Sequence, residues 1–176
     1  MPSFTKKAIM DSFLRLMEKK PLDKITVRDI VDDCGINRNT FYYYFQDIYA
    51  VLEEQCDILI GALPQNSTIF DTVMALFRYI EHFAIEHRRA AKSLAFSLGF
   101  EGLDRYFGER FEPLMATLIA QKYGAPPSKV VLRFLRHGLI GIGLDLLRGE
   151  KISDDPAGEL RILLSLPLPN QTNSQN

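Results

Sequence analysis

Residues 26–45 read TVRDIVDDCGINRNTFYYYF, and this stretch decides the fold expected for the N-terminal part of the chain. Thr26 is a favoured helix N-cap, and Asp29 stands three residues later, where a capping box usually has glutamate. Apolar residues then recur at helical spacing until Gly35, which can end a helix in the left-handed conformation. Asn37 can cap a further short helix. The stretch therefore predicts two short helices joined by a tight turn.

Two short helices joined by a three-residue turn form a helix-turn-helix, whose second helix enters the major groove of DNA. The second helix begins with side chains that suit base edges and phosphates. They are Asn37, Arg38, Asn39 and Thr40. A run of aromatic residues follows, and these cannot all face one side of a helix. We expect Phe41 and Phe45 to face the core. Tyr42 and Tyr43 are then exposed, which favours contact with DNA over the alternative of a purely structural helix.

The charge of the chain gives no general attraction to nucleic acid. The formal net charge is −1, and the first fifty residues hold eight basic and seven acidic side chains. DNA binding must therefore depend on where individual charges lie and not on an overall basic field.

Helical periodicity continues outside this motif, and no segment alternates like a strand. An amphipathic helix precedes the motif, with Ile9, Phe13, Leu16 and Met17 on its apolar face. After the motif, Asp47 can cap a fourth helix. Residues 64–67 then indicate a loop.

Three apolar stripes at helical spacing follow this loop, over residues 73–84, 91–98 and 103–118. Pro113 should kink or restart the third. A long helix is predicted from Ser128 to about Arg148, and a short one over 157–166. We therefore expect an all-α chain with a helix-turn-helix domain over 1–46, a helical bundle over 47–166 and a disordered tail over 167–176.

In motif detail, the segment from Ile9 to Glu54 resembles the TetR family of transcriptional regulators. It carries the Thr-Val-Arg-Asp-Ile helix start, the Gly-Ile turn and the Thr-Phe-Tyr-x-Tyr-Phe run. The resemblance implies three N-terminal helices that bind double-stranded DNA and a helical body that binds a ligand and dimerises. It also implies a homodimer on a palindromic operator, which a small molecule entering the body releases from DNA or, less often, recruits to it. The family favours a repressor over an activator, and the sequence alone does not distinguish the two.

The resemblance assigns roles to individual residues. Thr26 and Arg28 match positions that touch the phosphate backbone. The groove-facing positions are Asn37, Arg38, Asn39, Thr40, Tyr42 and Tyr43. The family often has a small residue where this chain has Asn39, so Asn39 can add a base contact. Gln46 and Ile48 stand where the family usually has lysines, so we expect weaker backbone contact and a shallower salt dependence.

The C-terminal body is rich in phenylalanine. A stripe of rings at helical spacing can be plain core, or it can line a pocket for a largely apolar effector. The pocket candidates are Phe77, Phe83, Phe96, Phe107, Phe111, Met115, Phe134 and His137.

Three glycines, Gly138, Gly141 and Gly143, lie inside the predicted long helix, where each costs about 1 kcal/mol relative to alanine. They suggest close packing, either of a partner helix across a two-fold axis or of a neighbour within the monomer. In the first reading, the long helix and the last short helix form a four-helix interface. Its candidate residues are Gly138, Gly141, Ile142, Leu160, Leu163 and Leu164.

Other functional classes find little support in the sequence. It has no di-iron pairing, phosphate-binding glycine loop, nucleophile elbow or zinc-protease motif. Cys34 and Cys56 are too far apart for a metal or redox pair, and we expect both in the core. We expect no enzyme activity, no metal and no cofactor. The alternative function is a helical protein-interaction module that kept the fold and lost specific DNA binding.

The start of the chain lacks the features of a signal peptide, because Lys6 and Lys7 precede an amphipathic stretch and not an apolar run. No stretch reaches the roughly 18 apolar residues of a membrane span. We therefore expect a cytoplasmic protein without membrane contact.

Overall fold

The computed structural model describes residues 4–63 and 67–165, and their regular secondary structure is entirely helical. This confirms the all-α expectation. The α-helices are α1 (Phe4–Met17), α2 (Val27–Cys34), α3 (Arg38–Tyr44), α4 (Ile48–Ala62), α5 (Ile69–Glu86), α6 (Arg88–Leu103), α7 (Glu109–Tyr123), α8 (Lys129–Arg148) and α9 (Pro156–Ser165). A 3₁₀ turn, η1 (Leu22–Lys24), follows α1, and a π-helical turn, η2 (Asp104–Gly108), joins α6 to α7. The tail predicted over 167–176 lies outside the described residues.

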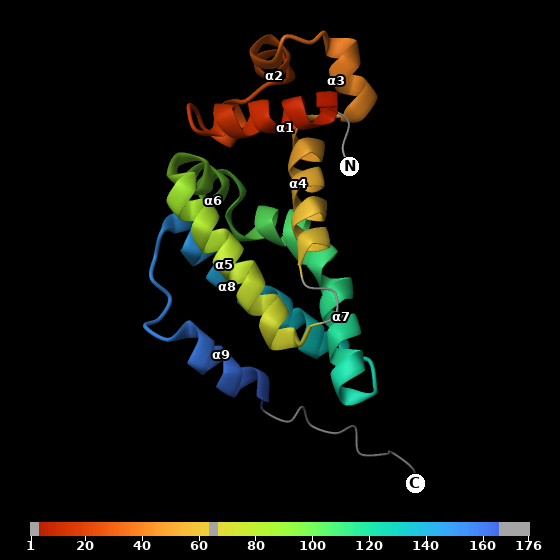
Figure 1. Cartoon of the computed structure of the whole chain (residues 1–176), viewed down its shortest axis with the longest axis vertical. Helices are drawn as coiled ribbons and strands as arrows, with labels where there is room; N and C mark the ends of the chain where they lie inside the picture. The colour runs from red at the N-terminus through yellow and green to blue at the C-terminus, as the bar shows by residue number, and fades with distance from the viewer. Residues whose placement is uncertain (1–3, 64–66, 166–176) are drawn as a thin grey trace.

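Helices α1, α2 and α3 lie together at one end of the molecule (Figure 1). Helix α4 runs from this end into a body built from α5, α6, α7 and α8, and α9 packs on α5. The predicted boundary between residues 46 and 47 falls between α3 and α4.

The capping residues named from the sequence begin and end the helices as expected. Thr26 forms a complete capping box with Asp29. Gly35 ends α2 with a φ of 69°, in the left-handed region where a side chain is disfavoured. Asn37 and Asp47 accept hydrogen bonds from the backbone of α3 and α4. The positions of the two short helices are therefore set by local sequence.

The N-terminal helices share one apolar core with the body. This core includes Ile9, Phe13 and Phe41 from α1 and α3, together with Cys56 from α4 and Ala90 from α6. Burial raises the pKa of the Cys56 thiol to about 12, which keeps it a small apolar group. Because α4 and α6 complete this core, the helix-turn-helix is packed firmly onto the body.

The segment from α6 to α7 breaks at a different place from the one predicted. Helix α7 runs through Pro113 without interruption, so the expectation of a kink or restart there was wrong. The break is at Gly99, whose φ is 58°, and the π-helical turn η2 follows directly before α7. Pro113 is the fifth residue of α7, about one helical turn after the π-helical turn η2.

Candidate DNA-binding surface and ligand cavity

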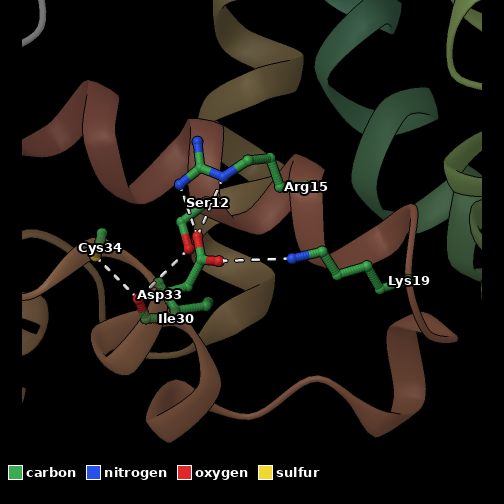
Figure 2. A network of polar contacts seen from close by, with 6 residues as sticks. All are labelled: Ser12, Arg15, Lys19, Ile30, Asp33 and Cys34. Atoms are coloured by element: carbon green, nitrogen blue, oxygen red, sulfur yellow. Dashed lines mark hydrogen bonds and ion pairs between the residues drawn. The ribbon is translucent and has the colours of Figure 1, made fainter.

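A polar network fixes α2 against α1 (Figure 2). The Arg15 guanidinium donates to Asp33 Oδ2 from Nη2 at 2.6 Å and from Nε at 3.2 Å. The buried Ser12 hydroxyl faces the Ile30 carbonyl oxygen, 3.4 Å away, and the Asp33 carboxylate. Hydrogen bonds from Ser12 and Arg15 hold the pKa of Asp33 below its usual range, so this carboxylate is ionised at neutral pH. The network therefore orients α2, and through the turn it orients α3.

The exposed face of α3 carries the predicted groove-facing residues. Phe41 and Phe45 are buried, whereas Tyr42 and Tyr43 are 54% and 81% exposed, which confirms the expected division of the aromatic run. Arg38 and Asn39 are exposed one helical turn before the tyrosines. Helix α3 lies at the outer end of the molecule, away from the body (Figure 1).

Four of the predicted DNA contacts, Thr26, Arg28, Asn37 and Thr40, already have interactions within the protein. Asn37 Oδ1 accepts the backbone N–H of Thr40 at 2.8 Å and its hydroxyl at 3.1 Å. The Thr26 hydroxyl donates to Asp29 at 2.6 Å. Arg28, at the surface of α2, lies 3.5 Å from Asp32. The side chains of α3 that point outward without an internal hydrogen bond among the described residues are thus Arg38, Asn39, Tyr42 and Tyr43.

Most cations of the N-terminal helices are paired with acidic residues of the same molecule. The pairs are Lys6–Glu54, Arg15–Asp33, Lys20–Asp29, Lys24–Asp23 and Arg28–Asp32. Arg38 is exposed and makes no ion pair with any described residue. Although the segment is nearly neutral overall, α3, the predicted recognition helix, therefore carries one cation, Arg38, that no acidic side chain of the described residues pairs with.

The start of α4 has no lysine at the two positions where the family usually has one. Gln46 is exposed beside α3, and Ile48 packs partly buried against the N-terminal core. Asp47 caps the helix with a hydrogen bond of 2.9 Å from the Ala50 N–H. At the two positions where lysines were expected by resemblance, the structure therefore presents one neutral polar side chain and one apolar side chain.

A cavity of about 250 Å³ lies within the body, lined by α4, α5, α7 and α8, and reaches the inner face of α1. Of the eight pocket candidates, the structure places Phe83, Phe107, Phe111 and Met115 on its wall. The volume is slightly below the roughly 300–1,000 Å³ of typical ligand sites, so the cavity suits a small molecule.

The other four candidates do not line this cavity, which corrects the prediction for them. Phe77 is buried in the core between α5 and α7. Phe96 and Phe134 are 87% and 70% exposed, because their positions on α6 and α8 face away from the bundle. His137 packs edge-on against the Phe100 ring, with 5.3 Å between centroids. Helical spacing shows which residues share a face, but it does not show which face meets the cavity.

Sequence reasoning missed the polar part of the cavity wall. Arg136 of α8 lines the cavity together with Glu112 of α7 and binds Asp104 of η2. The neighbouring Arg136 guanidinium lowers the pKa of Asp104. A signal was present in the sequence, because Arg136 interrupts an apolar stripe that includes Leu132 and Leu139.

One face of α8 is apolar and open in the single chain. A methyl group at Gly138 or Gly141 would meet no atom within 4 Å, whereas one at Gly143 would lie 3.6 Å from Ile80 Cδ1. Val130 and Phe134 are exposed on the same face as Gly138. A contact at 3.6 Å is an ordinary van der Waals distance, so packing within the monomer requires glycine at none of the three positions.

The remaining interface candidates lie elsewhere. Ile142 and Leu160 pack partly buried against the core of the body. The side chains of Leu163 and Leu164 lie outside the described part of the structure.

The described residues contain neither a cluster of metal ligands nor a membrane-spanning helix. No three histidine, cysteine or acidic side chains are placed together so that they could hold a metal ion. None of the described helices combines the length and apolar character that spanning a bilayer requires.

The N-terminal part of the sequence matches a family model and a curated protein. Residues 9–54 match the family model of bacterial regulatory proteins, tetR family. The uncharacterized HTH-type transcriptional regulator YerO of Bacillus subtilis (strain 168) is 34% identical over 56 residues, which is 32% of this chain and 19% of that protein.

Solved structures resemble the chain over nearly its whole length. The dihydroxyacetone kinase operon activator DhaS has a TM-score of 0.63 and 22% identity, covering 93% of this chain and 96% of its own. A TetR transcriptional regulator from Streptococcus agalactiae 2603V has a TM-score of 0.61 and 22% identity, covering 91% and 92%. At this identity the likeness shows the fold.

Proposed function

Since the chain carries a TetR-family helix-turn-helix on a TetR-like helical body, we propose that it is a cytoplasmic transcriptional repressor that binds a palindromic operator as a homodimer. A small, largely apolar effector releases it from DNA. The observation that carries this proposal is the outer face of α3, where Arg38, Asn39, Tyr42 and Tyr43 are exposed around a buried Phe41.

These side chains have the chemistry of a DNA-reading surface. Arg38 can bind guanine or a phosphate, and Asn39 can bind adenine through its amide. The two tyrosine hydroxyls can reach phosphates, with the rings available to thymine methyl groups. Thr26, Arg28 and Gln46 flank α3 and are exposed, so they complete the proposed contact surface.

Dimerisation is supported by the open apolar face of α8. Val130, Phe134, Gly138 and Gly141 line one side of this helix, and a second copy would cover them. A two-fold axis beside α8 would make this contact isologous, and it would present two copies of α3 to one DNA duplex.

The effector would act through the cavity. Its wall includes Phe13, Leu14 and Met17 of α1, so a bound molecule would touch the DNA-binding part of the chain directly. A ligand that binds better when α1 is displaced would shift the dimer away from the spacing that DNA requires.

A gel-shift titration with DNA from upstream of the gene for this chain tests the proposal. We expect the wild type to retard a discrete fragment at concentrations of tens of nanomolar. A variant with Tyr42→Ala and Tyr43→Ala should lose the shift while keeping its thermal midpoint, since both side chains are exposed. Equal retardation by the two proteins would contradict the assignment of α3.

One observation favours a second candidate function, a helical protein-interaction module without specific DNA binding. The internal pairing of the cations at Lys6, Arg15, Lys20, Lys24 and Arg28 reduces the charge available to phosphates. This candidate predicts that no upstream fragment is retarded, and that binding to random DNA disappears at physiological salt.

A further inference from the structure

The wall of the cavity carries more negative than positive charge. Most of its lining is apolar, and its charged side chains are Glu86, Glu112 and Arg136, together with the titratable His82 and His87. No lysine belongs to the described lining. Arg136 is the arginine of this lining, so the sign of the charge that a ligand meets depends on whether its guanidinium is free to bind the ligand or is already paired with carboxylates.

Arg136 is fully engaged by carboxylates. Its Nε and Nη2 donate to the two oxygens of Asp104 at 2.6 Å each, and its Nη1 donates to Glu112 Oε2 at 2.9 Å. Two carboxylates contact one guanidinium, so these three side chains together carry a formal charge of −1. An anionic ligand would have to displace one of these partners and would be repelled by both.

The geometry of η2 keeps this arrangement in place. A methyl group on Gly108 would lie 2.6 Å from Asp104 Oδ1 and 3.1 Å from Arg136 Nε. The ion pair therefore passes directly over Gly108, where a side chain would have to displace it.

The part of the cavity beside α1 is also acidic. Glu86 lies 3.3 Å from His82 Nδ1 and 4.0 Å from His87 Nε2. Behind His87, Glu18 Oε1 is buried 3.5 Å from His87 Nδ1 and has no hydrogen-bond partner among the described residues. Two carboxylates, those of Glu18 and Glu86, therefore face His87 at this end of the cavity.

We propose that the effector is an amphipathic monocation, with an aromatic or aliphatic body and one protonated amine or quaternary ammonium group. This rests on the proposed function, because it names the class of ligand that the cavity takes. The cationic group lies beside Glu112, which offers Arg136 a single oxygen, and the body lies against Phe83, Phe107 and Phe111. Their rings attract a cation as well as an apolar surface.

Three probes of the same shape and different charge test the proposal. They are 3-phenylpropylammonium, 3-phenylpropanol and 3-phenylpropanoate, titrated by calorimetry into the full chain without DNA. We expect the ammonium ion to bind at least tenfold more tightly than the alcohol, and the carboxylate to show no heat of binding. Equal affinity of the ammonium ion and the alcohol, preference for the carboxylate, or no binding by the ammonium ion would overturn it.

A pair of variants locates the charge. Glu112→Gln keeps an oxygen for Arg136 and removes one negative charge, so the ammonium ion should lose about tenfold in affinity, a 1.4 kcal/mol difference, while the alcohol is unchanged. Glu109→Gln is the control, because Glu109 is exposed on the same helix and does not line the cavity. An equal loss in the two variants, or no loss in Glu112→Gln, would contradict the placement.

The same titrations separate this proposal from the proposed function. Calorimetry requires no DNA, so ammonium selectivity in a chain that retards no DNA would uphold the ligand class and reject the regulator. Specific DNA binding by a chain that binds the three probes with equal affinity would uphold the regulator and reject the ligand class.

Discussion

Arg38 places a positive charge on the exposed face of α3, the candidate DNA-binding surface. It is exposed at the start of α3 and makes no ion pair with a described residue, while its neighbours Arg28 and Lys24 each face an aspartate. A single arginine that reads a guanine is worth about 1–3 kcal/mol of binding free energy. Such a contact would give sequence preference to a domain with little overall charge.

We therefore predict that Arg38→Ala weakens operator binding about 5- to 150-fold, measured by fluorescence anisotropy at fixed salt. The thermal midpoint should not change, because the side chain is exposed. Lys24→Ala is the control, since it removes one charge from the same domain outside α3. Similar losses in the two variants would mean that overall charge, and not the face of α3, determines affinity.

Asp29 stabilises the start of α2 through its charge. Hydrogen bonds from Lys20 and Thr26 lower its pKa to about 2, below the value near 4 of an unfolded aspartate. Because the folded-state pKa is the lower one, the stabilisation is complete above about pH 4 and is lost as the pH falls through 2.

Asp29→Asn should accordingly lower the free energy of unfolding by about 1 kcal/mol at pH 7, as expected for a damaged cap. The difference from the wild type should shrink between pH 4 and pH 2. Urea unfolding at several pH values measures both effects. Asp32→Asn, which removes an exposed charge 3.5 Å from Arg28, should change stability by less than about 0.5 kcal/mol. A difference that is constant across this pH range would refute the role of the ionised Asp29.

The π-helical turn η2 is the element that joins the cavity to the packing of α8. Gly108 lies where Arg136 passes to reach Asp104, and a methyl group there would clash with both. π-Helical turns often occur at functional sites, and here the turn brings Asp104 and the lining residue Phe107 to the same side of α8.

Gly108→Ala should therefore destabilise the chain by about 1–3 kcal/mol, since crowding displaces the ion pair. Gly61→Ala in α4 is the matched control, because a methyl group there meets nothing within 4 Å. Alanine at that position should leave stability unchanged or raise it by about 0.5–1 kcal/mol. Thermal or urea unfolding compares the two, and equal stabilisation by both would show that the ion pair adapts freely.

The helices could be predicted from the sequence to the extent that their determinants are local. Thr26, Gly35, Asn37 and Asp47 act on their own backbone, and each lies where its chemistry indicates. The division of the aromatic run on α3 follows from the same helical geometry. Local rules therefore found the exposed face of α3, which is the candidate DNA-binding surface.

The cavity could be predicted only in part, because its wall depends on how helices face one another. Phe107 and Phe111 line the cavity, whereas Phe96 and Phe134 turn outward although they belong to equally apolar stripes. The pairing of Arg136 with Asp104 joins residues 32 positions apart through a π-helical turn. No local pattern reports such a turn, so the polar part of the cavity emerged only from the structure.

For the molecule as a whole, the two proposed activities meet at α8 and α1. One face of α8 bears the cavity wall and another bears the open glycines, while α1 lies between the cavity and the helix-turn-helix. A ligand in the cavity would therefore contact α1 and the inner face of α8, whose other face carries the proposed dimer contact, and both helices could transmit its binding.

The dimer contact predicts the effect of a large side chain at Gly141. Gly141→Leu should not destabilise the monomer, because the position is open, but it should block a partner helix and convert the dimer to a monomer. Sedimentation equilibrium measures the mass in solution. Gly61→Leu, at another open glycine on α4, should remain dimeric. An unchanged dimer in the Gly141 variant would place the interface elsewhere.

Selection of bound duplexes from a random DNA pool examines most directly whether the exposed face of α3 reads DNA as a pair. We predict enrichment of an inverted repeat whose half-sites lie about one or more helical turns apart, at the spacing that two recognition helices can reach. The same selection with Arg38→Ala should lose or change the preferred base at one position in each half-site. Recovery of no common sequence by the wild-type chain at physiological salt would contradict the account.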